Sequence, residues 1–122
     1  MTLKRGLFPK RGEVYLVNFD PTVGAEIRKT RPGLILQNDI ANRNSPVTIV
    51  AAVTSKFETP LYPTEVLVRT PEAGLTADSV ILLNQVRTID RQRLVRRLGT
   101  VKADTTTRVN RAIQISFGLV TL

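Results

Sequence analysis

The sequence lacks histidine, cysteine and tryptophan altogether. Without histidine, Ser-His-Asp hydrolysis, histidine-pair ribonuclease catalysis and nearly all transition-metal sites are excluded. Without cysteine, disulfides, thiolate zinc sites and cysteine nucleophiles are excluded as well. No glycine-rich phosphate-binding run is present, so we expect no nucleotide cofactor. Because histidine and cysteine ligands are missing, we also expect no metal. Carboxylates, hydroxyls, lysines and arginines are the side chains left for chemistry.

Long apolar runs are also absent. No segment approaches the ~20 apolar residues of a membrane span, and the first six residues lack the apolar core of a signal peptide. We therefore expect a cytoplasmic protein without a membrane partner. With 122 residues, 42% of them hydrophobic, the chain is predicted to form one globular domain, residues 1–122, with residues 1–10 as a basic N-terminal arm.

Positive charge is what the sequence has in excess. Eighteen Lys and Arg stand against ten Asp and Glu, which gives a net charge of +8 and a pI near 10.9. This balance favours a polyanionic partner. One basic block lies in the N-terminal arm, and a second contains Arg87, Arg91, Arg93, Arg96 and Arg97 with only Asp90 among them. We expect the last four of these arginines to face solvent or to pair with Asp90 and other acids.

Strand-forming patterns dominate the chain. Residues 13–19, 33–37, 47–53, 64–69, 79–83, 85–89 and 96–101 are predicted as strands. Residues 38–46 are predicted as a loop, and Asp90 begins a capped helical turn. Asp104 is expected to cap a helix from Thr105 to about Leu119, with an apolar face against the core or a partner. Strands followed by a terminal helix predict an α+β fold, mainly β, in the form of a small barrel or half-barrel.

The segment from Asp20 to Thr30 is longer and more charged than a hairpin connection requires. Asp20 and Glu26 faintly imitate the acidic cluster of a metal nuclease, but two separated acids in one loop are more often ordinary turn residues. Metal-free RNA cleavage fits the side chains that are present better, because RNA supplies its own 2′-hydroxyl nucleophile. Glu26 could accept a proton, Arg31 could clamp the phosphate, and the hydroxyl of Thr54 could hydrogen-bond a phosphate oxygen.

Four blocks in this order resemble one family. They are "RGEVYLVNFDPTVGAE", "RPGLILQND", "TIVAAVTS" and "DSVILLNQVRTIDRQRL". The sequence resembles the MazF/PemK-type toxins, the endoribonuclease half of bacterial type II toxin-antitoxin pairs, from about Arg11 to the C-terminus. The resemblance implies an SH3-like barrel of the plasmid-toxin kind, a homodimer, a cognate acidic antitoxin and metal-independent, sequence-specific cleavage of single-stranded RNA. Such cleavage would leave a 2′,3′-cyclic phosphate or 3′-phosphate and a 5′-hydroxyl.

The resemblance also places functional residues. The catalytic arginine of the family falls on Arg31 and its catalytic threonine on Thr54, and the loop acid falls on Glu26. Many relatives carry glycines in this loop where Ile27 to Thr30 stand here, so the loop should be stiffer, while Arg28 and Lys29 should add phosphate affinity. The other positions expected to contact RNA are Phe19, Lys56, Phe57, Gln85 and Arg87.

Two other functions remain open from the sequence. Toxins that resemble the CcdB family share the fold and poison DNA gyrase without catalysis. They depend on a C-terminal tail that contains tryptophan, whereas this chain has none and ends Val120-Thr121-Leu122. A basic barrel that only binds nucleic acid is the third reading, and it requires Arg31 and Thr54 to be dispensable. The recognised RNA bases and the antitoxin are not encoded in any pattern of the sequence.

Overall fold

A computed structural model describes residues 7–26 and 29–121. Arg28 and the first six residues of the predicted basic arm lie outside the described residues. The elements, in chain order, are β1 (Glu13–Asn18), β2 (Thr30–Ile35), α1 (Asp39–Asn44), β3 (Val47–Thr54), β4 (Glu65–Val68), the 3-10 turn η1 (Glu72–Gly74), β5 (Ser79–Asp90), η2 (Arg91–Arg93), β6 (Leu94–Thr100) and α2 (Ala103–Ser116). No helix among these residues is long and apolar enough to cross a membrane.

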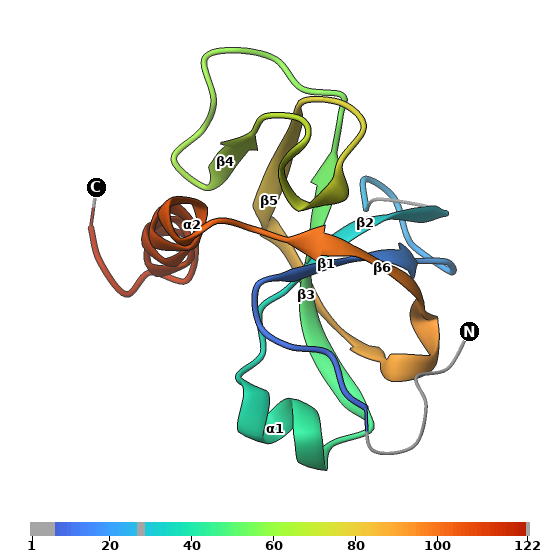
Figure 1. The fold of residues 1–122 in the computed structure, drawn as a ribbon. Helices are drawn as coiled ribbons and strands as arrows, with labels where there is room; N and C mark the ends of the chain where they lie inside the picture. Colours follow the sequence, from blue (N-terminus) through green and yellow to red (C-terminus); the bar gives the residue numbers. More distant parts are fainter. Residues whose placement is uncertain (1–6, 27–28, 122) are drawn as a thin grey trace.

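The six strands form one antiparallel sheet in the order β4-β5-β3-β2-β1-β6. Figure 1 shows β3 and β5 running across the direction of β1 and β6, so the sheet is strongly twisted and curved. Within the described part of the chain its edge strands, β4 and β6, do not pair with each other. The predicted mainly-β fold with a C-terminal helix is confirmed, in an open rather than a closed form.

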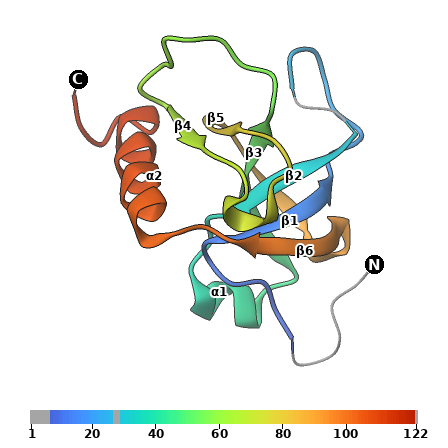
Figure 2. The ribbon, with the colours of Figure 1, turned by 45° about the horizontal axis from the view of Figure 1, so that its top comes forward.

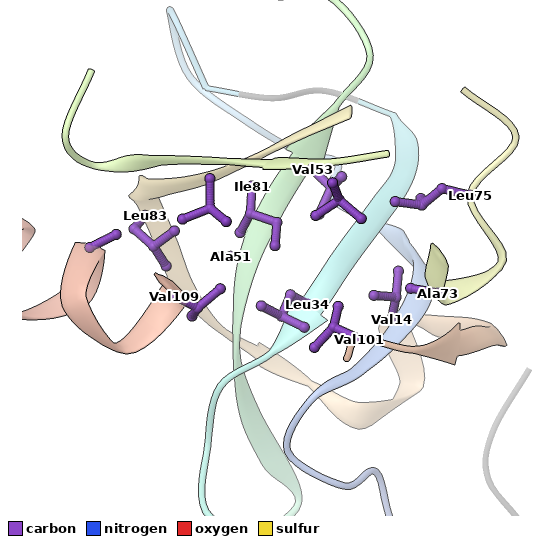
Figure 3. Close-up of a cluster of buried hydrophobic side chains, with 13 residues drawn as sticks. Val14, Leu34, Ala51, Val53, Ala73, Leu75, Ile81, Leu83, Val101 and Val109 are labelled. Carbon is purple, nitrogen blue, oxygen red and sulfur yellow. The ribbon is translucent and has the colours of Figure 1, made fainter. Parts of the chain in front are cut away.

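Alternation along the strands explains why both faces of the sheet are buried. In β3, Ala51 and Val53 belong to one apolar cluster, while Val50 and Ala52 belong to another. Successive side chains of a strand point to opposite faces, so the near-continuous apolar run of β3 supplies both clusters. Figure 3 shows the first cluster, in which Val109 of α2 lies beside the strand residues.

Helix α2 lies beside β4, as Figure 2 shows, and contacts both β4 and β5, where it contributes to the first cluster. Val109 and Ala112 are its buried apolar residues, as the i, i+3 spacing predicts. The predicted cap is wrong, because the helix begins at Ala103 and Asp104 lies in its first turn. The carboxylate of Glu72 accepts hydrogen bonds from the Lys102 N–H at 2.9 Å and from the Thr105 hydroxyl at 2.6 Å instead.

The segment expected to be a loop, residues 38–46, contains α1, so that expectation is wrong. Asn38 caps the helix by accepting a hydrogen bond from the Ala41 N–H at 2.8 Å. Asn42 is fully buried and accepts from the Thr48 hydroxyl at 2.7 Å and from Gln37 Nε2 at 2.9 Å. A short helix with few apolar residues is thus held by a polar network rather than by an apolar stripe.

The two strands expected at 79–83 and 85–89 are one strand, β5, with a bulge. Its partners on β3 change from Ala52↔Leu82 to Ala51↔Val86, so residues 83–85 have no opposite residues on β3. The predicted capped turn that follows is confirmed, since the Asp90 side chain accepts from the Gln92 N–H at 2.8 Å. The polar pair Asn84-Gln85 therefore lies in a bulge within one strand.

Candidate active site

The loop between β1 and β2 is closed at its base by contacts around Lys29. The Phe19 N–H donates to the Lys29 carbonyl at 2.9 Å. The Lys29 N–H donates to Asp20 Oδ1 at 2.9 Å. Lys29 also has a φ of +64°, a left-handed conformation that non-glycine residues rarely adopt. These contacts fix the direction in which the chain enters β2.

Glu26 closes a turn within the same loop. Its Oε1 accepts a hydrogen bond from the Val23 N–H, and its own N–H donates to the Val23 carbonyl at 3.2 Å. Asp20 and Glu26, the pair considered for a metal nuclease, thus both accept backbone N–H groups. Among the described residues, no group of three or more His, Cys, Asp or Glu side chains lies close enough together to hold a metal ion.

Arg31 and Thr54 are brought to one place by strand register. The β2–β3 ladder ends at the pair Gly33↔Ala52, and Arg31 and Thr54, each two residues beyond this pair, line the same cavity. Arg31 is exposed and Thr54 is half-buried. The Thr54 hydroxyl accepts from the Lys56 N–H at 3.1 Å, which orients the segment that follows β3.

An open cavity of about 760 Å³ joins these segments. Six of the predicted site residues line it: Glu26, Lys29, Arg31, Thr54, Lys56 and Gln85. Its described lining carries three cationic side chains and a single carboxylate, that of Glu26. Three like charges around one hollow attract an anionic ligand. Ligand pockets generally combine such polar groups with apolar walls, which Pro32, Val53 and Leu82 supply here.

A second, smaller cavity of about 300 Å³ adjoins the first, since Glu26 and Gln85 line both. Phe19 also lines it, but its ring is only 1% exposed and belongs to the core. Arg87 Nη1 donates to the Phe19 carbonyl at 2.9 Å, and its guanidinium lies 5.8 Å from the centre of the Phe19 ring. Phe19 and Arg87 are therefore tied to each other at the wall of this cavity.

Two predicted site residues fall outside this arrangement. Phe57 is half-buried against the second apolar cluster and lines neither cavity. Arg28 lies outside the described residues. One lining residue, Asn84, is missed by the sequence argument, although its polar side chain at the end of the apolar run Val80 to Leu83 is a usable signal.

The arginines after β5 do not pair with Asp90. Arg97 forms an ion pair with Glu13 at 2.7 Å, while Arg91 donates to the Leu7 carbonyl. Arg93 Nη1 donates to the Asn18 carbonyl at 3.1 Å and also to the Asp20 carbonyl. The expectation of solvent exposure or of pairing with acids thus holds for Arg97 through Glu13, while the Asp90 carboxylate caps η2. Arg96 and Arg97 are exposed, as expected, whereas Arg91 and Arg93 are half-buried.

The sequence of this protein is similar to those of known proteins. Residues 10–117 match the family described as "PemK-like, MazF-like toxin of type II toxin-antitoxin system". The chain is 44% identical to "Endoribonuclease EndoA" of Bacillus subtilis (strain 168) over 111 residues, which cover 91% of this chain and 96% of the relative.

Solved structures show the same fold. MazF of Deinococcus radiodurans (Form-I) superposes with a TM-score of 0.79 at 27% identity, covering 92% of this chain and 98% of that one. An "Endoribonuclease in complex with its cognate antitoxin from Mycobacterial species" superposes with a TM-score of 0.77 at 24% identity, covering 93% of this chain and 99% of that one. The family match spans most of the chain, including both cavities. The protein therefore belongs to the PemK-like, MazF-like family of toxins of type II toxin-antitoxin systems.

Proposed function

We propose that the protein is a metal-independent endoribonuclease toxin that cleaves single-stranded RNA at specific sequences. The observation that carries the proposal is the larger cavity, in which Glu26, Arg31 and Thr54 meet beside Lys29 and Lys56. Family membership supports it, because a relative that is 44% identical is an endoribonuclease by name. The single carboxylate among three cations fits an RNA phosphate better than a metal ion.

The proposed reaction uses the nucleophile that RNA carries. The 2′-hydroxyl loses its proton to a base, its oxygen forms a bond to phosphorus, and the P–O5′ bond breaks. The products are a 2′,3′-cyclic phosphate and a 5′-oxygen that takes up a proton to become a hydroxyl. Negative charge builds on the phosphate oxygens, and Arg31 and Thr54 stabilise it as donors from opposite strands.

Glu26 is the proposed proton acceptor. Its carboxylate lines both cavities, and its Oε1 already accepts from the Val23 N–H. That contact holds the carboxylate in place, while a carboxylate has further lone pairs with which to receive a proton. Gln85 and Arg87, which line the smaller cavity, are proposed to contact the RNA beside the cleaved bond, together with Lys29 and Lys56 for the phosphates.

The proposed setting is a homodimer in the cytoplasm, inhibited by a cognate antitoxin. The basic cavity favours an acidic antitoxin segment that competes with RNA for the same surface. A solved structural neighbour was obtained with its cognate antitoxin, which shows that a toxin of this fold binds such a partner. An acidic peptide that blocks RNA binding in a salt-dependent manner is the expected behaviour.

The experiment that tests this function incubates the purified protein with a long single-stranded RNA and its DNA counterpart in EDTA. We expect discrete RNA cuts with 5′-hydroxyl ends at one recurring sequence, and intact DNA. A substrate with a 2′-deoxy sugar at the cut site should not be cleaved, because the nucleophile is missing. Arg31→Ala should abolish cutting, whereas Arg111→Ala, at an exposed arginine of α2 outside both cavities, should not.

Two results would contradict the proposal. If the folded wild-type protein leaves RNA intact, then gyrase poisoning or simple nucleic-acid binding becomes the better reading. Cleavage that continues unchanged in Arg31→Ala, or on the 2′-deoxy substrate, would contradict the assigned chemistry even though RNA is cut.

A further inference from the structure

Two arginines hold three successive carbonyls where β1 runs into the loop of the site. Arg87, in β5, donates to the Phe19 carbonyl at 2.9 Å. Arg93, in η2, donates from Nη1 to the Asn18 carbonyl at 3.1 Å and also to the Asp20 carbonyl. These two residues are more than sixty positions distant in sequence from their acceptors. The contacts therefore tie the start of the loop to β5 through Arg87 and to the turn before β6 through Arg93.

The arginine contacts continue directly into the site. Asp20, whose carbonyl accepts from Arg93, uses its carboxylate to hold the Lys29 N–H at 2.9 Å. Lys29 lines the larger cavity and stands two residues before Arg31. Its left-handed backbone, φ +64°, is one that surrounding contacts must maintain, because it is disfavoured for any residue with a Cβ. Arg93, Asp20 and Lys29 thus form one connected path to the backbone that leads into Arg31 two residues later.

We propose that Arg93 is a positioning residue for RNA cleavage, acting through Asp20 and Lys29 to fix where Arg31 enters the cavity. The inference rests on the proposed function, since it concerns the rate of that reaction. Small displacements of a catalytic group are costly: misplacement by about 1 Å can lower a rate by about a hundredfold. A residue that never touches RNA can therefore control kcat.

The competing role for Arg93 is direct phosphate binding, as expected for a member of a basic block. Its geometry argues against that role. Arg93 is half-buried, does not line either cavity, and places Nη1 against two backbone carbonyls. Arg96, in the same block, provides the matched control, because it is exposed and no hydrogen bond or ion pair forms at its side chain within the described residues.

The test compares Arg93→Ala and Arg93→Lys with Arg96→Ala in single-turnover and steady-state cleavage of one RNA. We expect both Arg93 variants to lower kcat about ten- to a hundredfold with little change in KM. Lysine keeps the charge but ends near the position of the guanidinium carbon, so it cannot reach both carbonyls. We expect the slope of log Kd against log salt to stay at its wild-type value in all three variants.

A second measurement probes the contacts that lead from Arg93 through Asp20 to Lys29. Amide hydrogen exchange at Lys29 should become faster in both Arg93 variants and in Asp20→Ala, and should stay unchanged in Arg96→Ala. Because Arg93 and Asp20 act in series, the double variant Arg93→Ala/Asp20→Ala should lose about as much kcat as the worse single variant, rather than the product of the two losses. Assays run well below each melting temperature separate this effect from lost stability.

The outcomes are distinguishable. A wild-type protein that does not cut RNA contradicts the proposed function. If the wild type cuts and Arg93→Lys keeps the wild-type kcat, or if the Lys29 amide is unaffected, the positioning role is wrong. A weaker RNA affinity with a salt slope reduced by about one would identify Arg93 as a phosphate contact and also overturn the inference.

Discussion

The two ends of β3 carry the same residue type in opposite circumstances. Thr48, near the start, is fully buried and donates its hydroxyl to Asn42 Oδ1 at 2.7 Å. Thr54, at the end, is half-buried and lines the larger cavity. Among the residues that the structure describes, its hydroxyl makes hydrogen bonds only with the backbone of Lys56. In Figures 1 and 2, α1 lies at the first end, and the loops after β1 and β3 lie at the other.

The difference lies in where the polar groups find their partners. At the α1 end the protein satisfies its buried polar atoms internally, and no buried side-chain N or O atom in the described part of the chain lacks a partner. At the Thr54 end, polar groups gather around a hollow, and the cations Lys29, Arg31 and Lys56 stand near one another without a carboxylate for each. One end stabilises the fold, and the other is arranged for an anionic ligand.

The sharpest test of this contrast is Arg31→Ala. We expect cleavage to fall by about a thousandfold, because the donor that stabilises charge on the phosphate is lost. The side chain is exposed, so the free energy of unfolding should change by less than about 0.5 kcal/mol. Cleavage assays paired with denaturant melts give both numbers, and Arg31→Lys shows how much a charge without the guanidinium geometry restores.

Thr54→Val should lower kcat by about a hundredfold, since a hydroxyl donor is removed while the shape of the side chain is kept. Stability should again stay within about 0.5 kcal/mol of the wild type. Thr54→Ser, which retains the hydroxyl, is the matched control in the same kinetic assay. A large loss of stability without a loss of kcat in the folded protein would break the contrast between the two ends.

Thr48→Val makes the equivalent change at the other end of β3. It should lower stability and leave kcat unchanged, which is the opposite of the result expected for Thr54→Val. Asn42 Oδ1 would keep only the Gln37 donor at 2.9 Å, so we expect the free energy of unfolding to fall by about 1–3 kcal/mol. The kcat of the folded variant should match the wild type. Chemical denaturation measures the stability of this variant, and cleavage assays at low temperature measure its kcat. A changed kcat would show that the two ends of β3 are coupled.

The smallest expected effect concerns the internal polar cluster around Glu72. Burial would raise the pKa of Glu72, but hydrogen bonds from the Thr105 hydroxyl and the Lys102 N–H, with the charges of Lys102 and Arg108, lower it below its ordinary value of 4.5. A lowered pKa contributes stability above about pH 4.5 that is lost as the pH falls further. Melting temperatures of wild type and Glu72→Gln should therefore converge on acidification, and a gap that stays constant would contradict this.

Tyr15 is a second group whose pKa its surroundings shift. Desolvation by burial, with the charge of Glu13 and a hydrogen bond to its carboxylate, raises the pKa of Tyr15 to about 12. The tyrosine therefore stays neutral throughout the pH range of the experiments above. The pH dependence expected near pH 4 is free of any contribution from this residue.

Local patterns in the sequence predicted most of the fold. Apolar and β-branched runs located β1 and β3, alternation located β4, and Asp90 identified its own capped turn. What escaped prediction depended on distant partners: Glu72 caps α2 from thirty residues away, and the Asn42 network rather than an apolar stripe supports α1. β2 begins at Thr30 instead of Gly33 because Asn18 of β1 pairs with Thr30.

The site shows the same division. Resemblance and loop chemistry selected Glu26, Arg31 and Thr54, and these line one cavity, although their roles stay predictions until tested. Phe19 and Phe57 were expected to contact RNA; in the structure Phe19 is a buried member of the second apolar cluster and Phe57 packs against that cluster. Arg93 was expected to face solvent or to pair with an acid, because no local pattern reveals that an arginine will reach the carbonyls of Asn18 and Asp20.

The bulge in β5 has a consequence for how such a toxin changes over time. Asn84 and Gln85 line the smaller cavity from a segment that has no opposite residues on β3. Substitutions at these two positions leave the ladder on either side intact, whereas a one-residue deletion would reverse the faces of Val86 to Asp90. Under the proposed function, we expect replacement at these two positions to change target preference while the length of the strand stays constrained, so that new specificities would not require a new fold.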